Sequence, residues 1–130
     1  MEEKRVVTGK VVSGAQKAAY FTNLPWVQEQ CVEKLGFRPY PGTLNINVSE
    51  EGLLSVMELR KNEGIILCSP SADFCSAKAL PVLVESIECA LIIPPEDVNI
   101  HAENTLEIMA PVKLKDALGI RDGDLLTIVV

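Results

Sequence analysis

A short run of residues that could hold a metal ion against a phosphate lies in the first half of the chain. It reads Pro39-Tyr40-Pro41-Gly42-Thr43-Leu44-Asn45. The prolines fix φ at about −65°, and Pro41-Gly42 suits the central positions of a type II turn, where glycine supplies a positive φ. Successive side chains of a strand point to opposite faces, so Thr43 and Asn45 would share one face. The run therefore predicts a rigid turn that presents a hydroxyl and an amide oxygen side by side.

Thr43 and Asn45 are the candidate metal ligands. Two neutral oxygens are poor ligands for a bare cation, but they suit Mg²⁺ when phosphate oxygens and water complete its octahedron. The alternative interpretation is structural: a turn followed by an ordinary strand with two exposed polar side chains.

The hydrophobic pattern predicts the elements that must position this run. β-Branched and alternating segments predict strands over residues 5–13, 43–48, 65–68, 77–85, 87–93, 105–110 and 125–130. Val27, Cys31 and Leu35 recur at helical spacing after Pro25, and shorter helices are expected over 53–61 and 114–118. Six or seven strands with two or three short helices indicate a mainly β protein, a small barrel with helical insertions. The second half lacks the strand–helix alternation of a parallel α/β fold.

Composition narrows the functional classes. The chain has 130 residues, 48% hydrophobic and 23% charged, with no linker or repeat, so one domain over residues 1–130 is expected. A net charge of −6 argues against nucleic-acid binding. No apolar run approaches the roughly 20 residues of a membrane span, and no signal-peptide pattern opens the chain. Four cysteines without a Cys-x-x-Cys pair predict reduced thiols and a cytoplasmic location. The sequence carries no signal for an oligomeric state.

The run resembles the Pro-x-x-Gly-Thr-Leu-Asn signature of the archaeal CTP-dependent riboflavin kinases. The resemblance covers nearly the whole chain, in matching order and spacing. The other matching segments are Val11-Val12-Ser13-Gly14 with Tyr20-Phe21, Leu106-Glu107-Ile108-Met109-Ala110-Pro111-Val112-Lys113-Leu114-Lys115, Leu118-Gly119-Ile120 and Asp122-Gly123-Asp124.

This resemblance implies a six-stranded cradle-loop (RIFT-like) barrel that transfers the terminal phosphate of CTP to the ribityl 5′-hydroxyl of riboflavin, giving FMN and CDP. It places Mg²⁺ on Thr43 and Asn45, and Glu107 beside the flavin, as a contact to the ribityl chain or as the base for its hydroxyl. Asn99 falls where the family has a flavin-binding threonine. The nucleotide would be lined by Gly14, Ala15, Gln16, Lys17, Ala18, Ala19, Val112, Lys113, Leu114 and Lys115. From residue type alone, Glu107 and the two lysines also fit solvated surface positions.

The nucleotide loop departs from the family pattern. Where the family has Gly-x-Gly-x-Gly-x-Tyr, residues 14–20 read Gly-Ala-Gln-Lys-Ala-Ala-Tyr, with only the first glycine kept. Glycines there would let the backbone approach a phosphate closely, so the change motivates an alternative: a catalytically impaired flavin- or nucleotide-binding relative. Lys115 stands where the family has arginine, whose planar fork it lacks. A third possibility, a barrel that recognises DNA or protein, is disfavoured for DNA by the acidic charge.

Overall fold

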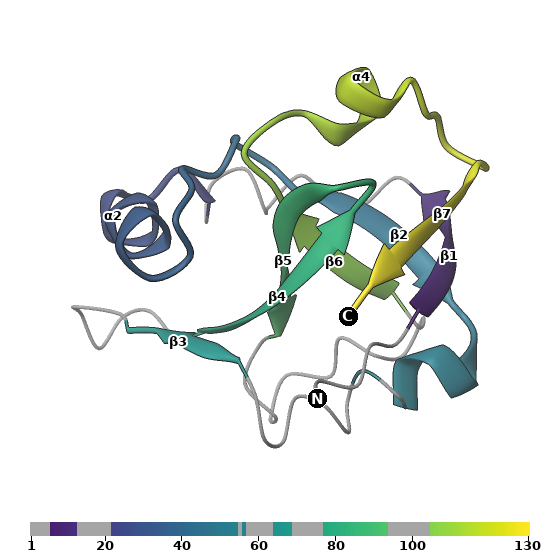
Figure 1. Ribbon diagram of the computed structural model, residues 1–130, viewed down its shortest axis with the longest axis horizontal. Helices are drawn as coiled ribbons and strands as arrows, with labels where there is room; N and C mark the ends of the chain where they lie inside the picture. Colours follow the sequence, from purple (N-terminus) through teal and green to yellow (C-terminus); the bar gives the residue numbers. More distant parts are fainter. Residues whose placement is uncertain (1–5, 13–21, 55, 57–63, 69–76, 94–104) are drawn as a thin grey trace.

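The computed structural model describes residues 6–12, 22–54, 56, 64–68, 77–93 and 105–130. In these parts of the chain seven strands form one antiparallel sheet with the order β3-β4-β5-β6-β2-β1-β7 (Figure 1). The strands are β1 (Val6–Val12), β2 (Leu44–Val48), β3 (Ile65–Leu67), β4 (Ala77–Val84), β5 (Ile87–Ile93), β6 (Thr105–Met109) and β7 (Leu125–Val129). The mainly β prediction is confirmed, and every strand lies within two residues of its expected bounds.

The sheet closes on itself through a pairing between β4 and β7. Leu83 of β4 lies opposite Val129 of β7, so β4, β5, β6, β2, β1 and β7 form a ring. The remaining strand, β3, pairs with the first residues of β4 and lies outside this ring. The expected six-stranded barrel is therefore present, with β3 added at its side.

Two helices carry labels in Figure 1, and they lie on different sides of the barrel. The first, α2 (Pro25–Lys34), begins with proline at its first position. It is followed by Gly36, whose N–H donates to the Cys31 carbonyl at 2.9 Å and closes the end of the helix. The second, α4 (Leu114–Leu118), ends at Gly119 with a left-handed φ of 64°. Both agree with the sequence prediction.

A third helical segment covers residues 50–54 and 56, and it starts three residues earlier than predicted. The reason is a capping residue. Ser49 accepts a hydrogen bond from the Gly52 N–H through its hydroxyl at 3.0 Å, as a serine N-cap does. The prediction followed the apolar residues and overlooked this serine. The expected end near residue 61 lies outside the described residues.

The interior of the barrel holds the larger of two apolar clusters. Alternate residues of the ring strands point inward, including Leu44 and Ile46 of β2 and Leu106 and Ile108 of β6. Leu114 of α4 and Ala110 pack onto the same cluster, so the end of β6 and the start of α4 are fixed to the barrel by apolar burial.

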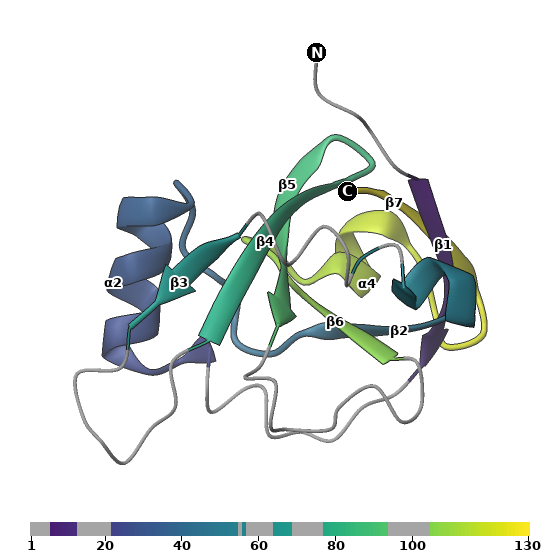
Figure 2. The same cartoon turned by 90° about the horizontal axis from the view of Figure 1, so that it is seen from below.

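A second cluster lies on the outer face of the barrel, beneath α2. Val27 and Cys31 of α2 are fully buried against Leu67 of β3, Ala90 of β5 and Met109 of β6. Figure 2 shows α2 beside β3 at one side of the molecule. Trp26 packs against the same cluster from its margin. This packing fixes the helix against the strand that leads into α4.

Hydrogen bonds from α2 side chains to backbone groups also attach the β3 segment to α2. The Gln30 carboxamide donates to the Cys68 carbonyl and accepts from the Cys68 N–H, each at 2.7 Å, and Lys34 Nζ donates to the Ile66 carbonyl at 2.9 Å. The Gln30 side chain thus bonds both backbone groups of Cys68, the residue that follows β3, and so holds this end of the edge strand against α2.

The cysteines of the described residues are free thiols. Cys31 and Cys89 are buried, and burial raises their pKa values to about 11 and about 12, whereas Cys68 is exposed. Cys75 lies outside the described residues. Among the helices of the described parts, none combines the length and the apolar character that crossing a membrane requires.

Candidate active site

The segment of residues 39–42, which we call the turn, joins α2 to β2. Gly42 has a φ of +106°, the positive φ that the sequence predicts for the second central residue of a type II turn and that other residues rarely adopt. The Tyr40 N–H donates to the Ala110 carbonyl at 2.7 Å, so the turn is bonded to the end of β6. Thr43 follows Gly42 directly and precedes the first residue of β2.

Thr43, Asn45 and Glu107 lie together on the outer face of the barrel; we call them the oxygen row. Leu44 and Ile46 point inward, so the residues that alternate with them point outward. Asn45 of β2 lies opposite Glu107 of β6 in the sheet register. The Thr43 hydroxyl donates a long hydrogen bond to Glu107 Oε1 at 3.4 Å. The expected pairing of Thr43 with Asn45 is therefore extended by a carboxylate.

Burial changes the charge balance of the oxygen row. Glu107 is half-buried, and desolvation raises the pKa of its carboxyl above the ordinary value of a glutamate, while the hydrogen bond from Thr43 lowers it in part. A carboxylate with a raised pKa holds a proton more readily, which is the property of a general base. Glu107 is therefore partly withdrawn from solvent and bonded to Thr43, rather than fully solvated.

The oxygen row fits Mg²⁺ by donor type. Asn45 is only 8% exposed, and its carboxamide makes no hydrogen bond with another described residue. No side-chain atom of Asn45 is both fully buried and without a hydrogen bond, so its amide keeps some contact with solvent and is open to a ligand. Hydroxyl, amide and carboxylate oxygens are the donors that Mg²⁺ prefers. In the described parts of the chain no three His, Cys, Asp or Glu side chains gather as a metal cluster.

A cavity of about 170 Å³ lies next to the oxygen row and shares Thr43 with it. Its floor is apolar, formed by Leu44, Ile108 and Leu114, and it continues beneath the turn of residues 39–42. Pockets that enclose a whole ligand typically measure about 300–1,000 Å³, so this cavity has room for one part of a nucleotide.

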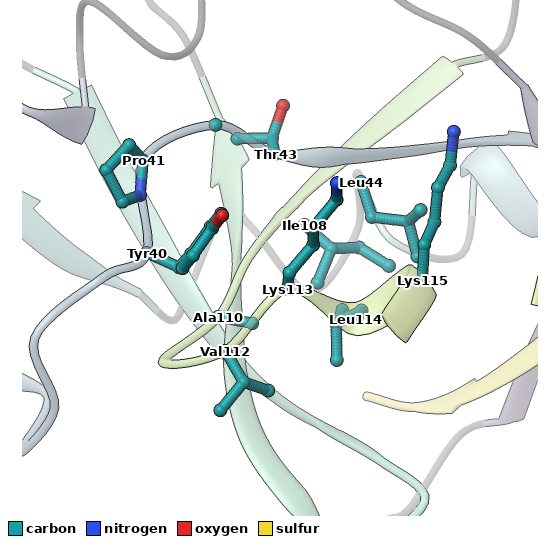
Figure 3. Close-up of a pocket in the computed structure, with 11 residues that line it drawn as sticks. Tyr40, Pro41, Thr43, Leu44, Ile108, Ala110, Val112, Lys113, Leu114 and Lys115 are labelled. Carbon is teal, nitrogen blue, oxygen red and sulfur yellow. The ribbon is translucent and has the colours of Figure 1, made fainter. Parts of the chain in front are cut away.

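Two lysines border the cavity; we call Lys113 and Lys115 the lysine rim. In the view of Figure 3 both side chains extend toward the strand that follows Thr43. Lys115 Nζ forms an ion pair with Asp122 at 2.8 Å, whereas Lys113 is exposed and has no ion pair among the described residues. The cavity therefore combines an apolar floor with a cationic border, as a site for a phosphorylated ligand requires.

The structure brings together most of the predicted site residues that it describes. Thr43, Asn45 and Glu107 meet on one face, and the predicted nucleotide residues 112–115 line the cavity that Thr43 shares. Asn99 and the loop residues 14–19 lie outside the described residues.

Two side chains near the turn were missed by the sequence analysis. The Thr22 hydroxyl accepts a hydrogen bond from the Gly42 N–H at 2.7 Å, and the Gln28 carboxamide donates to the Pro39 carbonyl at 3.0 Å. Thr22 has no local signal, because its partner lies 20 residues away. Gln28 did carry a local signal in the sequence. It is a polar residue four positions after Leu24, at the border of the apolar stripe of α2.

Comparison with known proteins decides the family. The model of a family named CTP-dep_RFKase, described as "Domain of unknown function DUF120", matches residues 11–130. The chain belongs to this family, that of the archaeal CTP-dependent riboflavin kinases. The matched range contains all three members of the oxygen row and both members of the lysine rim.

Curated relatives in this family carry the name riboflavin kinase. The protein of Archaeoglobus fulgidus is 35% identical over 127 residues, which are 95% of this chain and 54% of the relative. That of Methanosarcina barkeri is 38% identical over 125 residues, with 89% and 52% covered, and that of Pyrobaculum arsenaticum is 34% identical over 127 residues, with 95% and 60% covered. The chain spans about half the length of the curated relatives it matches.

Proposed function

We propose that this chain is a CTP-dependent riboflavin kinase, which transfers the terminal phosphate of CTP to the ribityl 5′-hydroxyl of riboflavin and yields FMN and CDP with Mg²⁺. One observation carries the proposal. Thr43 contacts Glu107 on the outer face and also lines the cavity bordered by Lys113 and Lys115. A phosphoryl transfer needs this juxtaposition, with a base for the acceptor beside a site for the donor phosphates.

The residues of the two groups divide into three proposed roles: metal binding, flavin binding with proton transfer, and phosphate binding. The Thr43 hydroxyl and the Asn45 amide oxygen hold the metal, and Glu107 binds the ribityl end of riboflavin and accepts the proton of its 5′-hydroxyl. Bound Mg²⁺ would neutralise charge on the phosphates of CTP. Lys113 and Lys115 bind phosphate oxygens, and the apolar floor excludes water from part of the nucleotide.

The bonds of the proposed transfer balance. The ribityl oxygen forms a bond to the terminal phosphorus as its proton passes to Glu107, and the bond from that phosphorus to the bridging oxygen of CTP breaks. The leaving group is CDP. Positioning and charge neutralisation supply most of the catalysis in such reactions. The proposed partners are therefore two small molecules, riboflavin and a nucleoside triphosphate.

Direct product analysis tests this function. Purified protein is incubated with riboflavin, Mg²⁺ and CTP, with ATP or GTP in parallel, and FMN is separated from riboflavin by chromatography. We expect FMN with CTP, dependent on the metal. Folded protein that forms no FMN with any of the three nucleotides would contradict the proposal. The flavin-binding alternative rests on residues 14–20, and the relatives that bear the name riboflavin kinase do not favour it.

A further inference from the structure

The turn that presents Thr43 is held from outside the barrel by one buried hydroxyl. Thr22 is fully buried, and its Oγ1 accepts the hydrogen bond of the Gly42 N–H at 2.7 Å. Gly42 lies one residue before Thr43, and its φ of +106° gives the turn its direction. A shift of the Gly42 amide would therefore move the Thr43 hydroxyl.

Gln28 of α2 connects Thr22 to Pro39, the first residue of the turn. Gln28 Nε2 donates to the Thr22 carbonyl at 2.6 Å and to the Pro39 carbonyl at 3.0 Å, while its Oε1 accepts from Arg38 Nη1 at 3.2 Å. The half-buried Gln28 side chain thus bonds both the residue that holds Gly42 and the residue that precedes Tyr40.

The opposite side of the turn is bonded to β6. The Tyr40 N–H donates to the Ala110 carbonyl at 2.7 Å, three residues after Glu107. The turn is therefore fixed between α2 and the strand that carries the candidate base. Three bonds from three different partners locate a four-residue segment far better than its prolines alone, because each proline restricts only the local dihedral angles.

We propose that Thr22 and Gln28 are positioning residues, which hold the turn of residues 39–42 so that the oxygens of Thr43 and Asn45 meet one metal ion. Neither side chain is proposed to touch substrate. This inference rests on the proposed function, in that the metal ion is the one that accompanies CTP. It goes further in stating that the affinity for Mg²⁺ depends on two side chains, Thr22 and Gln28, that lie outside the oxygen row and the lysine rim.

Matched variants in α2 and at Thr22, three positions before the helix, separate positioning from general stability. Thr22→Val keeps the shape and removes the acceptor of the Gly42 N–H, and Thr22→Ser restores a hydroxyl. Gln28→Met removes the two donated bonds and the bond accepted from Arg38. The control is Gln30→Met, on the same helix. The Gln30 side chain also makes two hydrogen bonds to backbone groups, but both are to Cys68, which follows β3 and is not part of the turn.

Three measurements are made on each folded variant. Amide hydrogen exchange at Gly42 reports the turn itself, calorimetry reports CTP binding with and without Mg²⁺, and fluorescence titration reports riboflavin binding. We expect Thr22→Val and Gln28→Met to speed exchange at Gly42 and weaken Mg²⁺-dependent CTP binding by about tenfold, with riboflavin binding unchanged. Thr22→Ser should restore both values, and Gln30→Met should leave both unaltered.

The outcomes distinguish this inference from the proposed function. Unchanged Gly42 exchange and unchanged Mg²⁺ dependence in Thr22→Val and Gln28→Met would overturn the positioning role, as would equal losses in Gln30→Met. If Thr22→Val does not fold, Gln28→Met decides the question, since this side chain is only half-buried. Wild-type protein that binds CTP with Mg²⁺ but forms no FMN would contradict the transfer and leave the positioning test intact. Wild-type protein that does not bind CTP with Mg²⁺ would overturn both.

Discussion

The oxygen row and the lysine rim lie side by side but differ in burial and in charge. Asn45 is almost entirely buried and Glu107 half-buried, while Lys113 is exposed and Lys115 is paired with Asp122. Oxygen ligands gain from fixed geometry because a metal ion demands it, whereas ammonium groups on flexible stems can follow a phosphate as it moves. The barrel thus gives the rigid positions to the groups that need them. Thr43 belongs to both regions.

The largest expected effect comes from the residue that the two regions share. Thr43→Val removes one metal ligand and the hydrogen bond to Glu107 while keeping the volume of the side chain. We expect FMN formation to fall by about 10³-fold or more, with the melting temperature within a few degrees of wild type. Thr8→Val is the control, since Thr8 is exposed and its hydroxyl bonds that of Thr127 between β1 and β7, away from both regions. Activity near wild type in Thr43→Val would break the link between the regions.

A smaller loss is expected when the oxygen row keeps its shape but loses its base. Glu107→Gln should lower kcat by about 10²-fold, and Glu88→Gln, at an exposed glutamate of β5, should leave it unchanged. In the wild type, kcat/KM should fall as the pH is lowered through the raised pKa of Glu107, since only the ionised carboxylate accepts the proton. A profile that is flat across that range would exclude Glu107 as the base.

The same shift predicts the sign of a stability effect. Burial raises the pKa of Glu107 in the folded state, so the unfolded state loses its proton first as the pH rises. The wild type should therefore lose stability relative to Glu107→Gln as the pH rises from the ordinary glutamate pKa through the raised one. Denaturant titrations at several pH values measure this difference. A wild type that gains stability over the variant in that range would contradict the desolvation of Glu107.

The two lysines of the rim should differ from each other. Lys113→Ala should raise the KM for CTP by about tenfold, because this ammonium group has no competing ion pair among the described residues. Lys115→Ala should raise it by less, about threefold, since Asp122 already neutralises part of its charge. Steady-state kinetics at low ionic strength measures both values. Equal effects, or a larger one for Lys115, would show that the ion pair opens on binding.

The smallest effect concerns the turn and is mainly one of stability. Gly42→Ala and Gly119→Ala both place a side chain at a positive φ with no atom within 4 Å of the new Cβ. Each should cost about 1 kcal/mol, or about 3–5 °C in melting temperature. Only Gly42→Ala should also lower activity, since Gly119 ends α4 outside the turn. Equal loss of activity in the two variants would show that the turn of residues 39–42 has no special role.

Local features of the fold were predictable because their signals lie within a few residues. The prolines and glycine of the turn, the apolar stripe of α2 and Gly119 after α4 each restrict the backbone directly. The pairing of Leu83 with Val129, which closes the ring, joins residues far apart in sequence and has no local signature. The position of β3 outside the ring follows from that closure. The number of strands was therefore predictable from the sequence, but which of them form the closed ring was not.

In the candidate site, too, local features were predictable from the sequence and long-range contacts were not. Alternation along a strand predicted that Thr43 and Asn45 share a face, and the family resemblance named Glu107. The contact between Thr43 and Glu107 depends on the register of β2 against β6, which the sequence does not reveal. Thr22 could not be found for a similar reason, because a hydroxyl that accepts a backbone bond 20 residues away looks like any other threonine.

A crystal structure with riboflavin, Mg²⁺ and a non-hydrolysable CTP analogue tests most directly whether Thr43 joins the two regions. We expect the metal about 2.0–2.1 Å from the Thr43 hydroxyl and the Asn45 amide oxygen, with phosphate oxygens completing its shell and the ribityl 5′-hydroxyl within hydrogen-bond distance of Glu107. A metal bound to the phosphates but to neither Thr43 nor Asn45 would contradict the central claim.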